Sequence, residues 1–203
     1  MIGIIDYGVA NLSSVHNAFD RLSLKNEVFS DPSNISQYSK LVLPGVGSFK
    51  LSMDLINKKG WNEKIRQRVE IGTPLLGICL GMQLLFSEGE EEGKTEGLNF
   101  ISGTVKKMGV NKNLKLPHVG WNNLIFKRPD NFFNGIVEDN DFYFTHSYSC
   151  VPDNMEVVLA EFNYGNNFVA CVKKKNIIGT QFHPEKSMTS GIRLLQNFST
   201  WEI

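Results

Sequence analysis

The sequence has few of the features that mark secreted or metal-binding proteins. Its 203 residues include only three cysteines, Cys79, Cys150 and Cys171, and they form no C-x-x-C pair. An odd number of cysteines without that spacing argues against a disulfide framework and against a zinc site. We therefore expect a reducing, cytoplasmic location and no metal or other cofactor.

Long hydrophobic runs and an excess of charge of one sign are also missing. The longest charge-free apolar run, residues 72–86, is interrupted by glycine and proline and is too short to span a bilayer. The N-terminal MIGIIDYG has no basic flank and is typical of a first strand, not of a signal peptide. The 21 basic and 21 acidic residues balance, whereas nucleic-acid-binding proteins usually carry a basic excess. We expect neither a membrane nor a nucleic acid as partner.

The first half of the chain instead shows short apolar strands alternating with helices. Such alternation predicts an α/β fold whose parallel sheet is covered on both faces, and the length predicts one domain, residues 1–203. The expected strands are MIGIID (1–6), NEVFS (26–30), SKLVLPG (39–45) and TPLLGI (73–78), and the expected helices are VHNAFDRL (15–22), WNEKIRQRVEIG (61–72) and LGMQLLFSEG (80–89).

After about residue 95 the strands become shorter and more alternating. Turn residues such as Gly135 and Gly165 separate them, which predicts a partly antiparallel extension of the sheet in the second half. A final helix is expected over GIRLLQNFSTWE (191–202). The expected strands here are ISGTVKKM (101–108), WNNLIFKR (121–128), DFYFTHSYSC (141–150), VVLAEFNYG (157–165), NFVACVKKKN (167–176) and IIGTQF (177–182).

Cys79 is a candidate nucleophile because of its place between a strand and a helix. Gly77 precedes it by two residues and Gly81 follows it by two. A nucleophile on a sharp strand-to-helix turn needs both glycines, because its own backbone is strained and the neighbouring chain passes close by. The sulfur would then lie at a helix N-terminus, where the dipole favours the thiolate. From this segment alone, a cysteine that merely fills the core is an equally good interpretation.

Of the four histidines, His183 is the best candidate for a base that acts on this cysteine. It follows the strand IIGTQF, and Glu185 comes two residues later, across the stiff Pro184. Residues i and i+2 of an extended segment face the same way, so Glu185 can orient the imidazole while the imidazole takes the thiol proton. The pattern predicts a triad of Cys79, His183 and Glu185.

A second glycine-containing loop could stabilise the negative oxygen that such an attack creates. The run LVLPGVGSF (41–49) ends a strand with Gly45 and Gly47, whose backbone N–H groups can point at an oxyanion. The N–H of Leu80, next to the cysteine, can join them. A P-G-V-G turn is common, however, and by itself this one is better explained as an ordinary loop.

Taken together, GICLGMQ, PGVGSF and TQFHPEKS resemble the triad (class I) glutamine amidotransferases. The resemblance implies a flavodoxin-like fold, with a central, mostly parallel sheet flanked by helices. Further segments, IDYGVANLSSV, PHVGWNNL, YFTHSY and HPEKSMTSGIRLLQNF, make nearly the whole chain similar to the glutamine amidotransferase subunits of imidazole glycerol phosphate synthase.

The resemblance also implies roles for individual residues. Cys79 would attack the side-chain amide of L-glutamine to form a glutamyl thioester, His183 would transfer the protons, and Glu185 would orient His183. The implied oxyanion donors are Val46, Gly47 and Leu80, and the implied glutamine-binding residues are Gln83, Glu91, Ser147 and Tyr148.

A partner is implied as well, because every motif found belongs to glutamine hydrolysis. The expected partner is a synthase/cyclase subunit of the HisF type, which would form a heterodimer with this chain. It would receive ammonia through a channel and make imidazole glycerol phosphate and aminoimidazole carboxamide ribotide in histidine biosynthesis. The expected interface residues are His118, Trp121, Asn122 and Tyr143, with His118 partly buried beside Trp121.

The remaining histidines and cysteines are expected to be structural. We expect His16 to lie at the surface or in packing contacts and His146 to pack on the sheet. Cys150 and Cys171 stand in β-like runs without a motif and are expected to fill the core.

Other functions stay open at this point. The chain has Ser149 and Cys150 after HSY and a looser GLNFISGTVKKM segment than the family pattern, so the partner could instead be a sugar-amidating enzyme of surface polysaccharide synthesis. A non-catalytic regulatory subunit with an idle triad, or a hydrolase of peptides or other γ-glutamyl bonds, is a further alternative. A dinucleotide-binding fold is excluded because no G-x-G-x-x-G follows the first strand.

Overall fold

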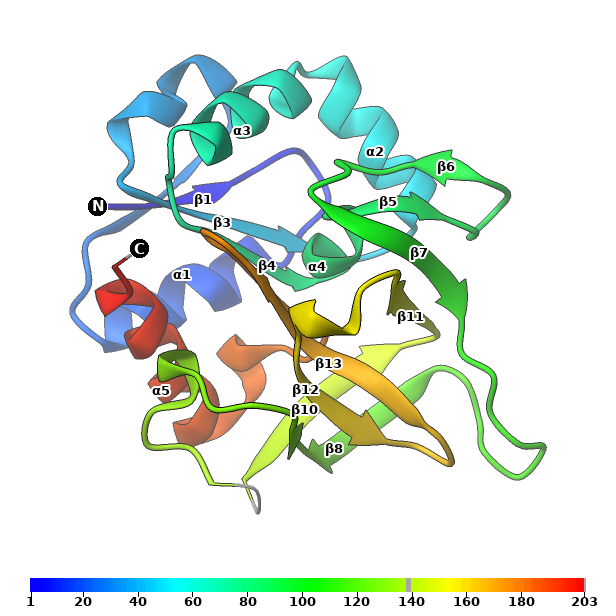
Figure 1. Ribbon diagram of the computed structural model, residues 1–203. Helices are drawn as coiled ribbons and strands as arrows, with labels where there is room; N and C mark the ends of the chain where they lie inside the picture. The colour runs from blue at the N-terminus through cyan, green and yellow to red at the C-terminus, as the bar shows by residue number, and fades with distance from the viewer. Residues whose placement is uncertain (138–139, 203) are drawn as a thin grey trace.

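The computed structural model describes residues 1–137 and 140–202, and an eight-stranded sheet forms its centre (Figure 1). The strand order is β2-β1-β3-β4-β14-β13-β12-β9. The first five strands run parallel, and each of the last three is antiparallel to its neighbour. The parallel part has the 2-1-3-4-5 order of flavodoxin-like folds, so the predicted α/β architecture with an antiparallel extension is confirmed.

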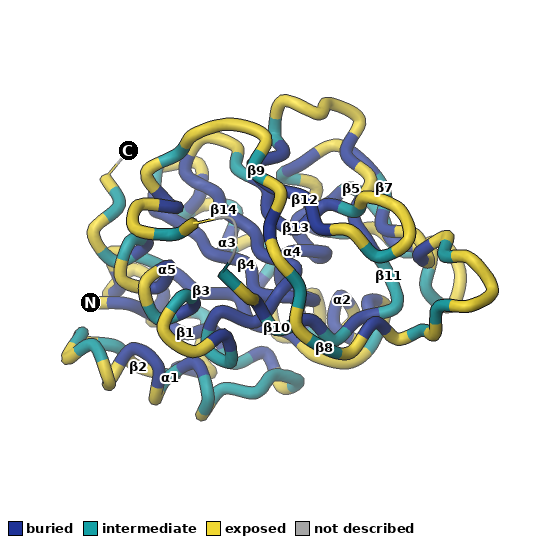
Figure 2. The backbone as a smooth tube through the Cα atoms, turned by 90° about the horizontal axis from the view of Figure 1, so that it is seen from below, coloured by how far each residue is buried: buried dark blue, intermediate teal, exposed yellow. Residues whose placement is uncertain are grey.

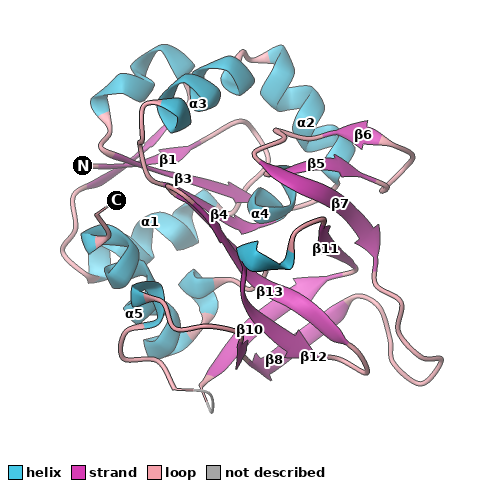
Figure 3. Cartoon of the chain, viewed as in Figure 1, coloured by secondary structure: helices cyan, strands magenta, loops and turns pink. Residues whose placement is uncertain are grey.

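Helices cover both faces of this sheet, with α1 and α5 on one side and α2 and α3 on the other (Figures 1 and 3). No helix within the described residues is long and apolar enough to cross a membrane. The helices are α1 Leu12–Arg21, α2 Phe49–Lys58, α3 Trp61–Glu70, α4 Leu80–Leu84 and α5 Met188–Thr200, with 3₁₀ turns at Pro32–Gln37, Asn131–Phe133, Met155–Val157 and Pro184–Lys186. The strands of the central sheet are β1 Ile2–Ile5, β2 Asn26–Phe29, β3 Lys40–Gly45, β4 Leu75–Cys79, β9 Ile125–Phe126, β12 Val158–Asn163, β13 Asn167–Lys174 and β14 Ile177–Thr180.

Two apolar layers form, one on each face of the sheet. Phe19 of α1 and Phe198 of α5 are fully buried in one layer, and Met53 of α2 and Trp61 of α3 in the other. Every residue of β4 is buried, as expected for a strand covered on both sides. Figure 2 shows the same arrangement, with buried strands at the centre and exposed segments mainly in the outer loops.

Two smaller sheets hold the rest of the strands. One has the order β11-β7-β5-β6 and the other pairs β10 with β8. Their strands are β5 Phe86–Gly89, β6 Thr95–Glu96, β7 Ile101–Lys107, β8 His118–Asn123, β10 Asp141–His146 and β11 Tyr148–Pro152.

The predicted helix over residues 80–89 is wrong beyond its first turn. The helix α4 ends at Leu84, and residues 86–89 form β5, which pairs with β6 and β7. These partners lie later in the chain, and their pairing outweighs the local helical pattern. The ten-residue helix α2 was not predicted at all.

Two predicted strands are each divided between different sheets. Residues 121–128 contribute to β8 and then, after Leu124, to β9. Residues 141–150 contribute to β10 and then to β11, with Ser147 between them. His146 is the last residue paired with β8, whereas Tyr148 already pairs with Lys107 of β7. The chain therefore changes sheets at Ser147, beside the site described next.

Candidate active site

Cys79 ends strand β4 and directly precedes helix α4, on the sharp turn that the glycine pattern predicts. Its φ is +55° and its ψ is −110°, in a region that a residue with a Cβ rarely adopts. Strained backbone of this kind persists only where the surroundings hold it in place. The side chain is 5% exposed.

The two flanking glycines are what allow the chain to pass here. A Cβ on Gly81 would lie 1.8 Å from the carbonyl oxygen of Leu43, and a Cβ on Gly77 would lie 2.7 Å from the carbonyl oxygen of Gly81. Neither distance is tolerable, so strand β3, strand β4 and helix α4 approach one another only because both positions lack a side chain.

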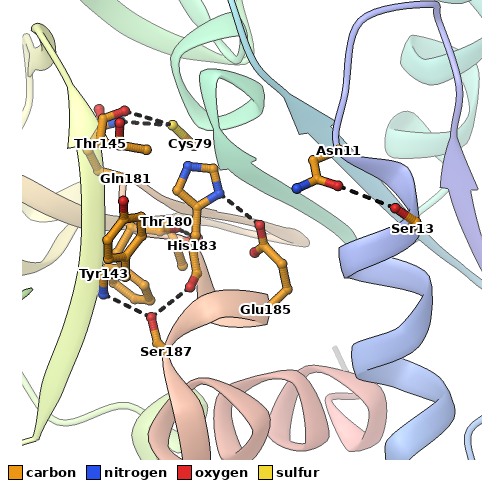
Figure 4. Close-up of polar contacts among 11 residues, drawn as sticks. Asn11, Ser13, Cys79, Tyr143, Thr145, Thr180, Gln181, His183, Glu185 and Ser187 are labelled. Carbon is orange, nitrogen blue, oxygen red and sulfur yellow. Dashed lines mark hydrogen bonds and ion pairs between the residues drawn. The ribbon is translucent and has the colours of Figure 1, made fainter. Parts of the chain in front are cut away.

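His183 and Glu185 stand on the turn that follows the neighbouring strand β14. The His183 Nδ1 donates to Glu185 Oε1 at 2.8 Å, and both side chains are almost fully buried. His183 Nε2 has no hydrogen-bond partner among the described residues. Figure 4 shows the imidazole between the Cys79 sulfur and the Glu185 carboxylate. The ring is thus held in the tautomer whose Nε2 can accept the thiol proton.

The groups around His183 favour its protonated form. Burial alone would lower the pKa of His183, but the Cys79 thiolate and the Glu185 carboxylate outweigh it and raise the pKa to about 10. The imidazole therefore carries its proton near neutral pH, between the sulfur and the carboxylate. Helix α4 has only five residues, so its dipole contributes less than the predicted ten-residue helix would.

A cavity of about 390 Å³ opens over Cys79 and His183. It collects every residue proposed from the sequence for the triad, the oxyanion and glutamine except Glu185, which lies behind His183. The members named from the sequence are Val46, Gly47, Cys79, Leu80, Gln83, Glu91, Ser147, Tyr148 and His183. The cavity also includes Pro117, Thr145, His146 and Lys186, which sequence reasoning did not assign to it although each lies within PHVGWNNL, YFTHSY or HPEK.

Glu91 is singled out from the acidic run by a contact with helix α2. Its Oε2 accepts from the Phe49 backbone N–H at 2.8 Å, at the start of the helix. Its neighbour Glu90 pairs instead with Lys106 at 3.3 Å, outside the cavity. One carboxylate of the run is therefore fixed at the cavity wall.

The backbone N–H of Val46 is not directed at the cavity in this structure. It points to the carbonyl oxygen of Val9 at 3.5 Å, in the loop between β1 and α1. As an oxyanion donor it would have to turn away from that carbonyl. The adjoining Gly47 has a φ of +95°, and beyond its chain neighbours no atom of the described residues lies within 4 Å of the position where a Cβ would stand, so this side of the loop is not packed against other residues.

The expectation that His118 lies beside Trp121 is wrong. The two residues are three apart on strand β8, and residues an odd number apart on a strand face opposite ways. His118 is 4% exposed and its ring lies 4.2 Å from that of Tyr164, whereas Trp121 is 43% exposed and its ring lies 5.6 Å from that of Tyr143. A contribution of His118 to an interface would therefore be indirect.

Cys150 and Cys171 are buried, as expected of residues that fill the core. Burial is the main cause that raises the pKa of each of these thiols well above its ordinary value. Neither offers a reactive thiolate near neutral pH, so Cys79 is the thiol expected to react with an alkylating agent.

His146 lines the cavity as a neutral side chain. Burial lowers its pKa to about 4, although its Nδ1 hydrogen bond of 2.8 Å to the Tyr148 carbonyl acts in the opposite direction. The unfolded chain has a histidine pKa near 6.5 and so binds a proton there before the folded chain does. Between about pH 6.5 and pH 4 the folded state therefore loses stability as the pH falls, by up to about 3 kcal/mol.

The variant His146→Gln is expected to remove this acid sensitivity. Its free energy of unfolding should fall less than that of the wild type between pH 7 and pH 4.5, as measured by urea unfolding at each pH. The matched control is Asn176→Leu, which replaces a buried polar residue that does not titrate and should lower the stability by the same amount at every pH. Parallel pH dependences of the wild type and His146→Gln would refute this account of His146.

Comparisons with known proteins agree with this geometry. A family model described as "Glutamine amidotransferase class-I" matches residues 3–200. The chain is 46% identical to "Imidazole glycerol phosphate synthase subunit HisH" of Syntrophotalea carbinolica over 98% of each chain. It is 48% identical to the protein of the same name from Geobacillus sp. (strain WCH70), over 98% of this chain and 96% of that one. A chain of the solved structure of PurLQS from Thermotoga maritima, only 18% identical, has the same fold, with a TM-score of 0.77 over 98% of this chain and 96% of that one.

Proposed function

Because this chain belongs to the class-I glutamine amidotransferase family, we propose that it hydrolyses L-glutamine to L-glutamate and ammonia. The observation that carries the proposal is the geometry of Cys79, His183 and Glu185 beside one cavity. His183 is buried, its Nε2 has no hydrogen-bond partner among the described residues, and Cys79 lies on a strained turn. A regulatory subunit with an idle triad would need none of these features.

Each step of the proposed reaction can be assigned to one of these three residues. The Cys79 thiolate attacks the side-chain amide carbon, and the amide oxygen takes the negative charge. When the tetrahedral intermediate collapses, the C–N bond breaks and the His183 Nε2 proton goes to the departing ammonia, which leaves a glutamyl thioester. Water, deprotonated by the same Nε2, attacks the thioester, and glutamate leaves as the Cys79 thiolate forms again. Glu185 keeps the imidazole oriented throughout.

We propose further that the ammonia goes to a separate cyclase subunit, in a cytoplasmic heterodimer that acts in histidine biosynthesis. Support comes from the full-length similarity to proteins named as subunits of imidazole glycerol phosphate synthase. The exposed Trp121 and the half-buried Tyr143 form an aromatic edge, and the Lys186 ammonium, in the cavity wall, lies 5.7 Å from the Tyr143 ring centre. This edge adjoins the cavity and is where a partner would collect ammonia.

The direction of the Val46 N–H predicts that the partner activates the glutaminase. Turning this N–H from the Val9 carbonyl toward the cavity would add one oxyanion donor, and one such donor changes kcat by roughly 10²- to 10³-fold. We therefore expect glutaminase turnover to rise by about that factor when the cyclase subunit and its acceptor ligand are added.

Reconstitution tests both proposals. Glutamate release is measured for the chain alone, with a HisF-type cyclase subunit, and with a sugar-amidating synthase of polysaccharide synthesis. Activation by the cyclase but not by the sugar-amidating enzyme supports the histidine-pathway assignment. Activation by the sugar-amidating enzyme but not by the cyclase overturns it. Equal rates with and without any partner would contradict the Val46 mechanism.

A further inference from the structure

We propose that Gln181 is a catalytic residue of this chain, because its side-chain amide donates to the Cys79 sulfur while its carbonyl fixes the orientation of Gln83. The inference rests on the proposed glutaminase function and adds a residue to its machinery. Gln181 lies directly after strand β14, two residues before His183, and is completely buried.

The contacts of Gln181 form a short chain of hydrogen bonds that ends at the nucleophile. Gln181 Nε2 lies 3.8 Å from Cys79 Sγ, a hydrogen-bond distance for sulfur (Figure 4). Gln181 Oε1 accepts from Gln83 Nε2 at 3.0 Å, and the same Gln83 nitrogen donates to the Tyr148 carbonyl at 3.0 Å. Both polar atoms of a fully buried amide are thus engaged within the site.

The chemistry of these groups determines which way each amide points. The Tyr148 carbonyl can only accept, so Gln83 must turn its nitrogen toward it. The second hydrogen on that nitrogen then requires an acceptor, which is Gln181 Oε1. Gln181 must therefore turn its own nitrogen toward the sulfur of Cys79. The exchanged orientation of either amide would bring two donors or two acceptors together.

A fixed N–H donor favours the thiolate over the thiol. Hydrogen bonds to a charged acceptor are stronger than those to a neutral one, so the amide stabilises the ionised sulfur more. The thiol form can donate to His183 Nε2, and its contact with the Thr145 carbonyl is longer, at 4.0 Å. His183 and Gln181 together therefore hold the ionised nucleophile.

The same chain of bonds has a consequence for the ligand. Both hydrogens of the Gln83 amide are used within the protein, so its Oε1 is left to accept a hydrogen bond. Gln83 lines the cavity, and an acceptor there suits an amine or ammonium group of the substrate. Gln181 would thus orient the Gln83 amide so that its oxygen faces the substrate, without itself touching the substrate's amine.

The variant Gln181→Met tests the inference, since methionine has a similar length and no amide. The rate of Cys79 alkylation by iodoacetamide is measured from pH 5 to pH 10, with the modified residue identified by mass spectrometry. We expect alkylation about tenfold slower than in the wild type at pH 7, with the difference shrinking as the pH rises. The kcat/KM for glutamine should fall in parallel.

The matched control removes another buried amide that does not contact the site. Asn176 is 6% exposed, and its nitrogen donates to the carbonyls of Val69 and Thr73. Asn176→Leu should lower the unfolding temperature yet keep the wild-type alkylation profile. Gln181→Asn, too short to bridge both partners, provides a second variant that keeps a polar group in the core and should also react more slowly.

The outcomes separate this inference from the function on which it rests. A folded Gln181→Met or Gln181→Asn with the wild-type alkylation profile overturns the role of Gln181, whatever the glutaminase rate. A wild-type chain that shows no glutamine hydrolysis with any partner, but whose Cys79 reacts more slowly in the variants, overturns the glutaminase proposal and leaves the sulfur contact standing.

Discussion

Replacing Cys79 with alanine is expected to lower glutamine-dependent product formation by roughly 10⁴-fold or more, because no other group near the cavity can form the thioester. With the cyclase subunit present, product formation from ammonium should stay at the wild-type level. The cyclase needs only free ammonia, and the fold of this chain does not depend on the sulfur. Both rates are measured on the reconstituted complex, with glutamine or ammonium chloride as the nitrogen donor.

Cys171→Ala is the matched control, since it removes a fully buried sulfur on strand β13. It should retain both glutamine- and ammonium-dependent turnover. If Cys79→Ala lowers product formation from glutamine and from ammonium equally, Cys79 is a structural residue and the thioester mechanism is wrong.

The second large effect is expected from Gly81→Ala, which should lower the free energy of unfolding by at least about 4 kcal/mol. The new Cβ would lie 1.8 Å from the Leu43 carbonyl oxygen, in a strand paired on both sides. The strand cannot retreat without breaking those pairings. Because domains of this kind are stable by only about 5–15 kcal/mol, most of the margin would be lost.

Gly109→Ala is the control for this substitution, because beyond its chain neighbours none of the described residues has an atom within 4 Å of the position of its Cβ. Its unfolding free energy should stay within about 0.5 kcal/mol of the wild type. Chemical denaturation followed by circular dichroism measures both variants. A Gly81→Ala chain as stable as Gly109→Ala would mean that the turn at Cys79 can be rebuilt, and the close packing argued above would be wrong.

The parts of the fold that could be predicted are those encoded by local patterns. The strand around Leu76, and the strand around Val42 after its first residue Lys40, are apolar because both faces are covered, and that composition is visible in the sequence. The turn at Cys79 was predictable because only glycine fits at residues 77 and 81, two residues before the cysteine and two residues after it. The juxtaposition of Cys79 and His183 could be inferred because each follows a strand whose end lies at the same edge of a parallel sheet.

The rest depends on contacts between residues far apart in the chain. The run around Ser147 alternates without a glycine or proline, so nothing local reveals that β10 ends there and a different sheet begins. The direction of the Val46 N–H depends on the carbonyl of Val9 in another loop. Gln181 looked like the end of an ordinary strand, because its two partners come from β4 and α4. Such features have no signature in a sequence window.

Strands β4 and β14 are direct neighbours, and their last pair, Ile78 with Thr180, stands immediately before Cys79 and Gln181. The register of this strand pair therefore sets the distance between the nucleophile Cys79 and the base His183. A slip by one residue would displace His183 by about 3.3 Å and turn its side chain to the opposite face, while much of the helix content would survive. Recovery of glutaminase activity after refolding would thus report correct strand alignment, which a secondary-structure measurement alone would miss.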